Sequence, residues 1–152
     1  MKWIILFSLC AIAVFLSDNG IAASTCSALG SRLNQTQLSS TLSGKLVCAS
    51  KIGALTGNDR WAEEHRTTGE LWEQGKGTTS TVHPPTKVGT WSIVGTGSNA
   101  AVQYNYSGGT TYTWSVFNSS GTLTFCTTNE TTVIATGSAI TPNPSSTNAC
   151  GF

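Results

Sequence analysis

From Gly89 onward, apolar side chains recur at every second position, and turn residues interrupt this pattern about every eight to twelve positions. A period of two is the repeat of a strand that buries one face. Ser107-Gly108-Gly109 and the Asn/Ser/Gly residues at 118–121 are typical hairpin connections. The pattern therefore predicts an antiparallel meander whose strands are Thr90–Val94, Ala101–Tyr106, Thr111–Phe117, Thr122–Cys126 and Thr132–Thr136.

Three further strands are expected upstream, at Gly44–Ser50, Arg60–Arg66 and Glu70–Gln74. A helix is the alternative for Asn58–Gln74, because good helix formers follow a possible Asn58 or Asp59 cap. About eight antiparallel strands would leave exposed sheet edges unless the sheet closed on itself. We therefore expect a mostly β domain, a small closed or partly open barrel, with a β-sandwich as the alternative.

The amino end has the features of a secretory signal peptide. Lys2 precedes an apolar run from Trp3 to Leu16, and small residues around Ala22 form a cleavage site. The run is shorter than the roughly 20 apolar residues that a membrane-spanning helix needs. We expect residues 1–22 to be a signal peptide, residues 23–152 to be one domain without a membrane span, and the protein to be secreted or periplasmic.

The predicted mature chain keeps four cysteines, which is an even number in a chain sent to an oxidising compartment. Two disulfides follow, with three possible pairings. The favoured pairing is nested, Cys48 with Cys126 and Cys26 with Cys150, since it would tie the strand region together and clamp both tails. The oligomeric state is left open.

Charge is concentrated in one short segment. Without the predicted leader the chain is close to neutral, so nothing attracts it to nucleic acid. Eight of its thirteen charged residues lie between Asp59 and Lys76. Any acid, base or ion site must therefore use this segment.

A hairpin over this segment would bring two carboxylates together. If Gly69 takes the left-handed position of a three-residue loop, Glu63 lies opposite Glu73, with His65 and Trp61 on the same face. Carboxylates about 5 Å apart suit a retaining glycosidase, so Glu63, Glu73 and His65 are the catalytic candidates if the protein is an enzyme. A solvated strand face is the simpler interpretation.

Other chemistries find little support. Neither His65 nor His83 has a partner at metal-ligand spacing, and the mature cysteines are expected to be oxidised. No nucleotide-binding or nucleophile-elbow motif is present. We expect no metal and no cofactor.

Aromatic residues could line a cavity inside the barrel. The candidates for ligand contact are Trp61, Trp72, Tyr104, Tyr112 and Trp114. The same rings would also serve as core, because a domain of this size needs bulky residues to fill its interior. If Tyr104 and Tyr106 both point inward, at least one hydroxyl needs a polar partner.

Two parts of the sequence resemble known groups of proteins. The Gly89-Thr90-Trp91 triplet resembles the strand start of lipocalins and avidin-like barrels. The wider pattern, Trp61 to His65, Gly69 to Trp72, Val88 to Ser92 and a closing Phe125-Cys126, is similar to a group of small secreted bacterial proteins that are themselves uncharacterised. That resemblance implies a bacterial periplasmic or extracellular location and no activity.

Three functions remain open at this point. The first is a non-catalytic barrel that binds a small or extended ligand, or an envelope component. The second is a glycosidase-like hydrolase that uses Glu63 and Glu73. The third is a purely structural or adhesive module. An aromatic cavity would favour the first function, and a cleft over both glutamates would favour the second. The third function predicts neither feature.

Overall fold

Each of the eight predicted segments forms a strand in the computed structural model, which describes residues 25–53, 59–76, 84–142 and 149–151. The predicted signal peptide 1–22, Asn58 and His83 lie outside the described residues. The strands are β2 (Lys45–Lys51), β3 (Arg60–His65), β4 (Glu70–Lys76), β5 (Thr86–Val94), β6 (Ala101–Tyr106), β7 (Thr111–Ser119), β8 (Thr122–Cys126) and β9 (Val133–Ile140).

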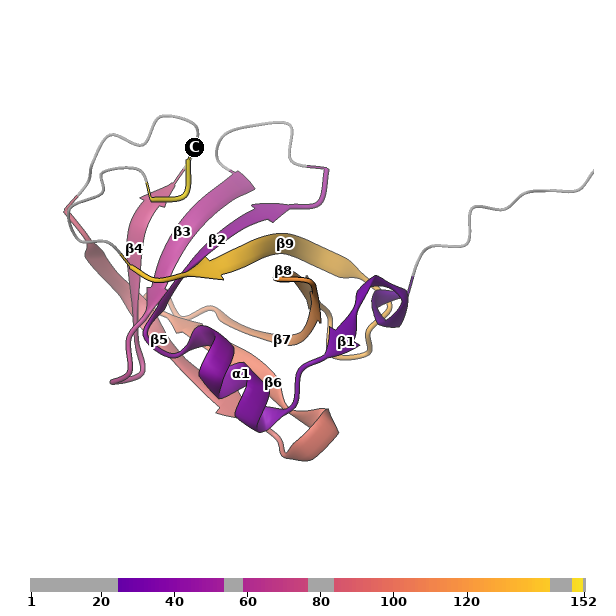
Figure 1. Cartoon of the computed structure of the whole chain (residues 1–152). Coiled ribbons are helices and arrows are strands. Elements are labelled where there is room, and N and C mark those ends of the chain that lie inside the picture. Colours follow the sequence, from indigo (N-terminus) through magenta and orange to yellow (C-terminus); the bar gives the residue numbers. More distant parts are fainter. Residues whose placement is uncertain (1–24, 54–58, 77–83, 143–148, 152) are drawn as a thin grey trace, which may run out of the picture.

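The eight strands close into an up-and-down barrel (Figure 1). Each strand pairs antiparallel with the next, and β9 completes the ring by pairing with β2. A two-residue strand, β1 (Ser31–Arg32), adds to β7 beyond the end of its pairing with β6. Closure pairs the edges that a flat meander would expose. The predicted barrel is confirmed, and the sandwich alternative is wrong.

One end of the barrel is covered by the helix α1 (Gln35–Leu42), which contacts β2, β5 and β6. Leu38 and Leu42 of α1 are fully buried in the main apolar core. Asn34 caps the helix by accepting from the Gln37 amide, and the Gln37 side chain accepts from the Asn34 amide in return. The described part of the chain holds no helix long and apolar enough to cross a membrane.

The β3–β4 hairpin has the predicted register. Glu63 pairs with Glu73, and the Arg66 amide donates to the Glu70 carbonyl at 3.0 Å across the loop. Gly69 has a φ of 83°, a left-handed conformation that glycine adopts at little cost. The helix alternative is therefore wrong for the described residues of this segment.

The predicted disulfide pairing is wrong. Two bridges are present, but Cys26 pairs with Cys126 and Cys48 with Cys150, with Cα atoms 6.5 and 5.4 Å apart. The reason is that β9 lies between β2 and β8, the strands that carry Cys48 and Cys126. Two strands separated by a third are about 10 Å apart, beyond the reach of a disulfide. Each strand cysteine instead binds one tail to the barrel wall.

The amino-terminal segment is held to the barrel by more than its disulfide. Cys26 lies in a short 3-10 helix, η1 (Cys26–Leu29), which covers a small apolar cluster of Phe117, Cys126 and Val133. Arg32 of β1 forms an ion pair with Glu130 in the β8–β9 connection. The residues from 25 to 42 therefore wrap one wall and one end of the barrel.

Candidate functional site

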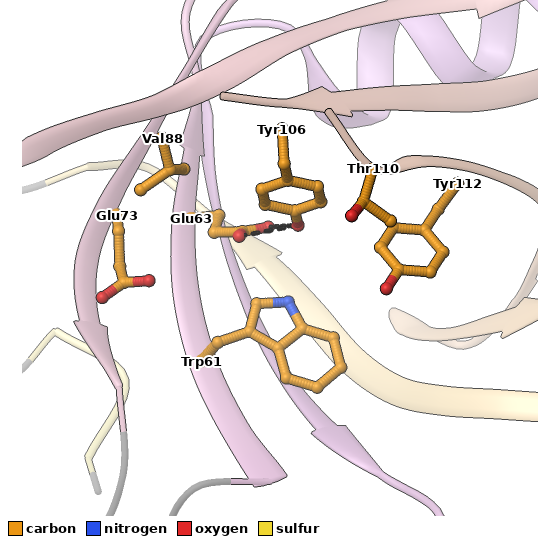
Figure 2. A pocket seen from close by; sticks show the side chains of 7 residues that line it. All are labelled: Trp61, Glu63, Glu73, Val88, Tyr106, Thr110 and Tyr112. Atoms are coloured by element: carbon orange, nitrogen blue, oxygen red, sulfur yellow. Dashed lines mark hydrogen bonds between the residues drawn. The ribbon is translucent and has the colours of Figure 1, made fainter. Parts of the chain in front are cut away.

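The other end of the barrel holds a cavity of about 310 Å³. The strands β3 to β7 line it, at the ends where β3, β5 and β7 begin and β4 and β6 finish. Its floor is polar, and aromatic rings form its sides (Figure 2). The lining residues are Trp61, Glu63, Glu73, Val88, Tyr106, Thr110 and Tyr112.

A buried glutamate lies at the floor of this cavity. Glu63 is 6% exposed, and the Tyr106 hydroxyl donates to both of its carboxylate oxygens, at 2.8 and 3.1 Å. Burial, with the adjacent Glu63 charge and this hydrogen bond, raises the pKa of Tyr106 far above its ordinary value. Tyr106 therefore keeps its proton and holds the carboxylate in place as a donor.

Glu73 faces the same cavity from β4. It stands directly opposite Glu63 in the sheet, where paired Cβ atoms are about 5 Å apart. In Figure 2 the Glu63 carboxylate points toward Tyr106, whereas that of Glu73 points in another direction. Glu73 is partly exposed. The cavity thus carries one fixed carboxylate and one nearer solvent.

Beneath Glu63, toward the helix-covered end, His65 occupies the barrel interior. His65 is 1% exposed, and its Nδ1 lies 3.1 Å from the Glu63 carbonyl. A carbonyl only accepts, so Nδ1 carries the hydrogen of the neutral ring. Nε2 is then the acceptor of the Tyr104 hydroxyl, at 2.9 Å.

This arrangement keeps His65 neutral. Burial lowers the pKa of His65 to about 4, against a smaller opposing effect of the hydrogen bond to the Glu63 carbonyl. Burial also raises the pKa of Tyr104 well above its ordinary value. Protonation of His65 would place a hydrogen on Nε2 against the Tyr104 hydroxyl hydrogen. His65 is therefore a structural donor and acceptor, and it lies outside the 310 Å³ cavity.

Trp91 supports His65 from β5. The two rings meet edge to face with centroids 5.1 Å apart, and the Trp91 indole donates to the Arg66 carbonyl at 2.9 Å. Gly89, two residues earlier, has no room for a side chain, because an added Cβ would come within 2.2 Å of the Asn105 carbonyl oxygen. The Gly89-Thr90-Trp91 triplet thus brings β5 close to β6 and fixes the β3–β4 loop.

A row of aromatic rings runs from the interior to the rim. Tyr106 and Tyr112 meet edge to face at 5.9 Å, and Tyr112 stacks on Trp114 at 5.4 Å. Tyr112 is 43% exposed and forms part of the rim. The phenol of Tyr104 continues the row inward, 6.5 Å from Tyr106.

The five predicted ligand-contact residues fall into three places. Trp61 and Tyr112 line the mouth cavity, and Tyr104 and Trp114 border a smaller interior space of about 30 Å³, which Trp61 borders as well. Trp72 lies outside both cavities. It pairs with Glu64 on the opposite face of the hairpin, where the Arg66 guanidinium covers its ring at 3.8 Å.

The charged residues of the hairpin divide between the two faces of the sheet. On the outer face Arg66 pairs with Glu64 and Glu70, and Lys87 pairs with Glu70 at 2.8 Å. Glu63 and Glu73 face the cavity. The simpler interpretation, a solvated strand face, therefore applies to the residues of the outer face and not to Glu63 and Glu73.

Two lining residues, Val88 and Thr110, were not predicted, whereas Tyr106 was considered as an inward-facing residue but was left out of the five ligand-contact candidates. The alternation that places Tyr104 inward also places Tyr106 inward, so its signal was present. No sequence signal marked Val88, because a register shift between β4 and β5 leaves it as an extra residue in the β5 strand. Thr110 belongs to the β6–β7 connection, where no periodicity applies.

The site has limited chemical possibilities. Among the described residues, no three His, Cys, Asp or Glu side chains gather as a metal site would require. Its functional groups are two carboxylates, phenol and indole rings, and one threonine hydroxyl. Comparisons with protein-family models, with curated proteins and with solved structures each find no match.

Proposed function

We propose that this protein binds a small ligand in the mouth of its barrel, without a catalytic step. The observation that carries the proposal is Glu63, a carboxylate buried at the cavity floor and held by Tyr106. Burying a carboxylate costs free energy that an apolar residue would not. A concave site with aromatic walls and a few convergent polar groups is the usual form of a ligand pocket.

Rigidity supports the same function. The cavity is built mainly from paired strands of a closed barrel, and two disulfides hold the tails against the wall. A preformed site loses little conformational entropy when a ligand binds. A purely structural or adhesive module has no need of such a cavity.

The binding proposal is tested by native mass spectrometry of the protein from its own host. A bound small molecule that is lost on denaturation is expected. Tryptophan fluorescence then locates it: Trp61→Phe in the cavity should lose the ligand-induced change, and Trp72→Phe on the outer face should keep it. Equal changes in both variants would place the ligand elsewhere.

We also propose that the protein works outside the cytoplasm, in a bacterial periplasm or the extracellular medium. The two disulfides suit an oxidising compartment. Amino-terminal sequencing of the exported protein should begin at Ala23. An uncleaved chain recovered from the cytoplasm would contradict this location.

Hydrolysis is the alternative use of the same carboxylates, because both line one cavity. A retaining glycosidase would need Glu63 as the nucleophile, ionised and oriented by Tyr106, and Glu73 as the acid. Glycoside turnover that disappears in Glu73→Gln would establish this function and displace simple binding.

A further inference from the structure

We infer that the ligand presents an organic cation, an ammonium group or protonated amine on a small apolar body, to Glu63 and Glu73. This inference rests on the proposed function and adds the chemical class of the ligand. It follows from the charge of the cavity, from its aromatic walls and from its size.

Charge is the first argument. Both charged residues that line the cavity are carboxylates, and the described lining contributes no lysine or arginine. Arg66 of the hairpin and Lys87 of the neighbouring strand β5 form ion pairs on the outer face. An anion entering the mouth would meet repulsion in a partly desolvated site. A cation would be attracted by both carboxylates.

The aromatic walls are the second argument. Trp61, Tyr106 and Tyr112 border the space in front of the carboxylates (Figure 2). Ring faces attract alkylammonium groups, and tryptophan does so most strongly. The Tyr106 hydroxyl is already donated to Glu63, so this residue offers mainly its ring to a ligand.

These features distinguish an organic cation from a metal ion. Calcium takes six to eight oxygen ligands and magnesium an octahedral set, whereas this cavity offers two carboxylates and a few hydroxyls. Rings and a valine contribute nothing to metal coordination but do cover an apolar body. At about 310 Å³, the cavity lies at the small end of ligand pockets.

The test compares two probes of nearly identical shape. Choline carries a trimethylammonium group, and 3,3-dimethylbutan-1-ol replaces it with a neutral tert-butyl group. Binding is followed by the NMR chemical shift of the Trp61 indole N–H, in protein with both disulfides formed. Choline is expected to bind about tenfold or more tightly than the alcohol, and high salt should weaken choline alone.

Glutamate-to-glutamine variants locate the interaction. Glu73→Gln should weaken choline binding about fivefold to tenfold and leave the alcohol unchanged. Glu64→Gln, which removes a carboxylate from the outer face, should leave both probes unchanged. Glu73 is preferred to Glu63, because Glu63→Gln would replace one of the two buried oxygens that accept from Tyr106 with an amide group that only donates, which would disturb the barrel itself.

The outcomes separate this inference from the proposal on which it rests. Equal binding of both probes in the cavity would leave ligand binding in place and overturn the cationic class. Binding of neither probe would also overturn the cationic class, and the native mass measurement would then decide whether the cavity binds anything. Choline binding that persists equally in Glu73→Gln would refute the role of the carboxylates.

Discussion

Acidification from pH 7 to pH 4 should destabilise the barrel through His65. Burial holds the pKa of His65 at about 4 in the folded protein, against 6.5 for an unperturbed histidine. Between these two values the unfolded chain binds a proton that the folded chain does not. Stability therefore falls as the pH falls through this window.

The magnitude follows from the two pKa values. Linkage gives a loss of about 2 kcal/mol between pH 7 and pH 5, and about 3 kcal/mol by pH 4. A single domain is stable by about 5–15 kcal/mol, so this is a substantial share. Glu70, whose pKa is lowered chiefly by its hydrogen bond from Lys87, adds a loss only below about pH 4.5.

The assay is urea unfolding of the disulfide-bonded protein at 25 °C over a series of pH values. His65→Gln should be less stable at pH 7 but should lose most of the slope between pH 7 and pH 5. His83→Gln, the other histidine of the chain, is the matched control. A two-dimensional NMR titration of the His65 ring nitrogens gives its pKa directly.

Two results would refute the reasoning. One is a free energy of unfolding that stays constant between pH 7 and pH 5. The other is a His65 ring that titrates near pH 6.5 in the folded protein. Tyr104→Phe provides an internal check: without the hydroxyl that donates to Nε2, the neutral ring is less favoured, and the pKa of His65 should rise.

Three further predictions concern stability. Cys48→Ser should remove the bridge to the carboxyl end, which closes a loop of about 100 residues, and lower stability by about 4–5 kcal/mol in thermal or urea unfolding; a variant that melts with its parent would contradict the bridge. Gly89→Ala should cost at least about 1–3 kcal/mol, because its Cβ would overlap a backbone carbonyl of β6, whereas Gly108→Ala has open space and should be nearly neutral; similar losses in both would argue against the close approach of the strands. Leu38→Ala should lower the free energy of unfolding by about 2–5 kcal/mol, because it leaves a cavity in the core at the helix-covered end. Chemical unfolding measures this loss, and a loss below about 1 kcal/mol would show that α1 does not seal the barrel.

Local regularities in the sequence determined most of the barrel. Alternating side chains and hairpin residues identify all eight strands, and β6 and β8 have the predicted bounds. The register of Glu63 against Glu73 followed from a three-residue loop ending at Gly69. These features depend on residues close together in the chain, where periodicity and turn geometry act directly.

The helix α1 escaped prediction although its signals were present. Asn34 and Gln37 have the spacing of a capping box, and Leu38 and Leu42 are four residues apart, as on one helix face. The segment is short and its other residues are polar. Its stability comes from packing against the end of the barrel, which the sequence pattern does not display.

The pairing of the cysteines and the set of residues that line the cavity were decided by tertiary structure. Cys48 cannot reach Cys126 because barrel closure inserts β9 between their strands. Trp72 lies on the outer face, and irregular pairing of β4 with β5 leaves Val88 to line the cavity. Alternation along a strand fixes which residues share a face, but strand order, bulges and closure determine which faces meet around the site.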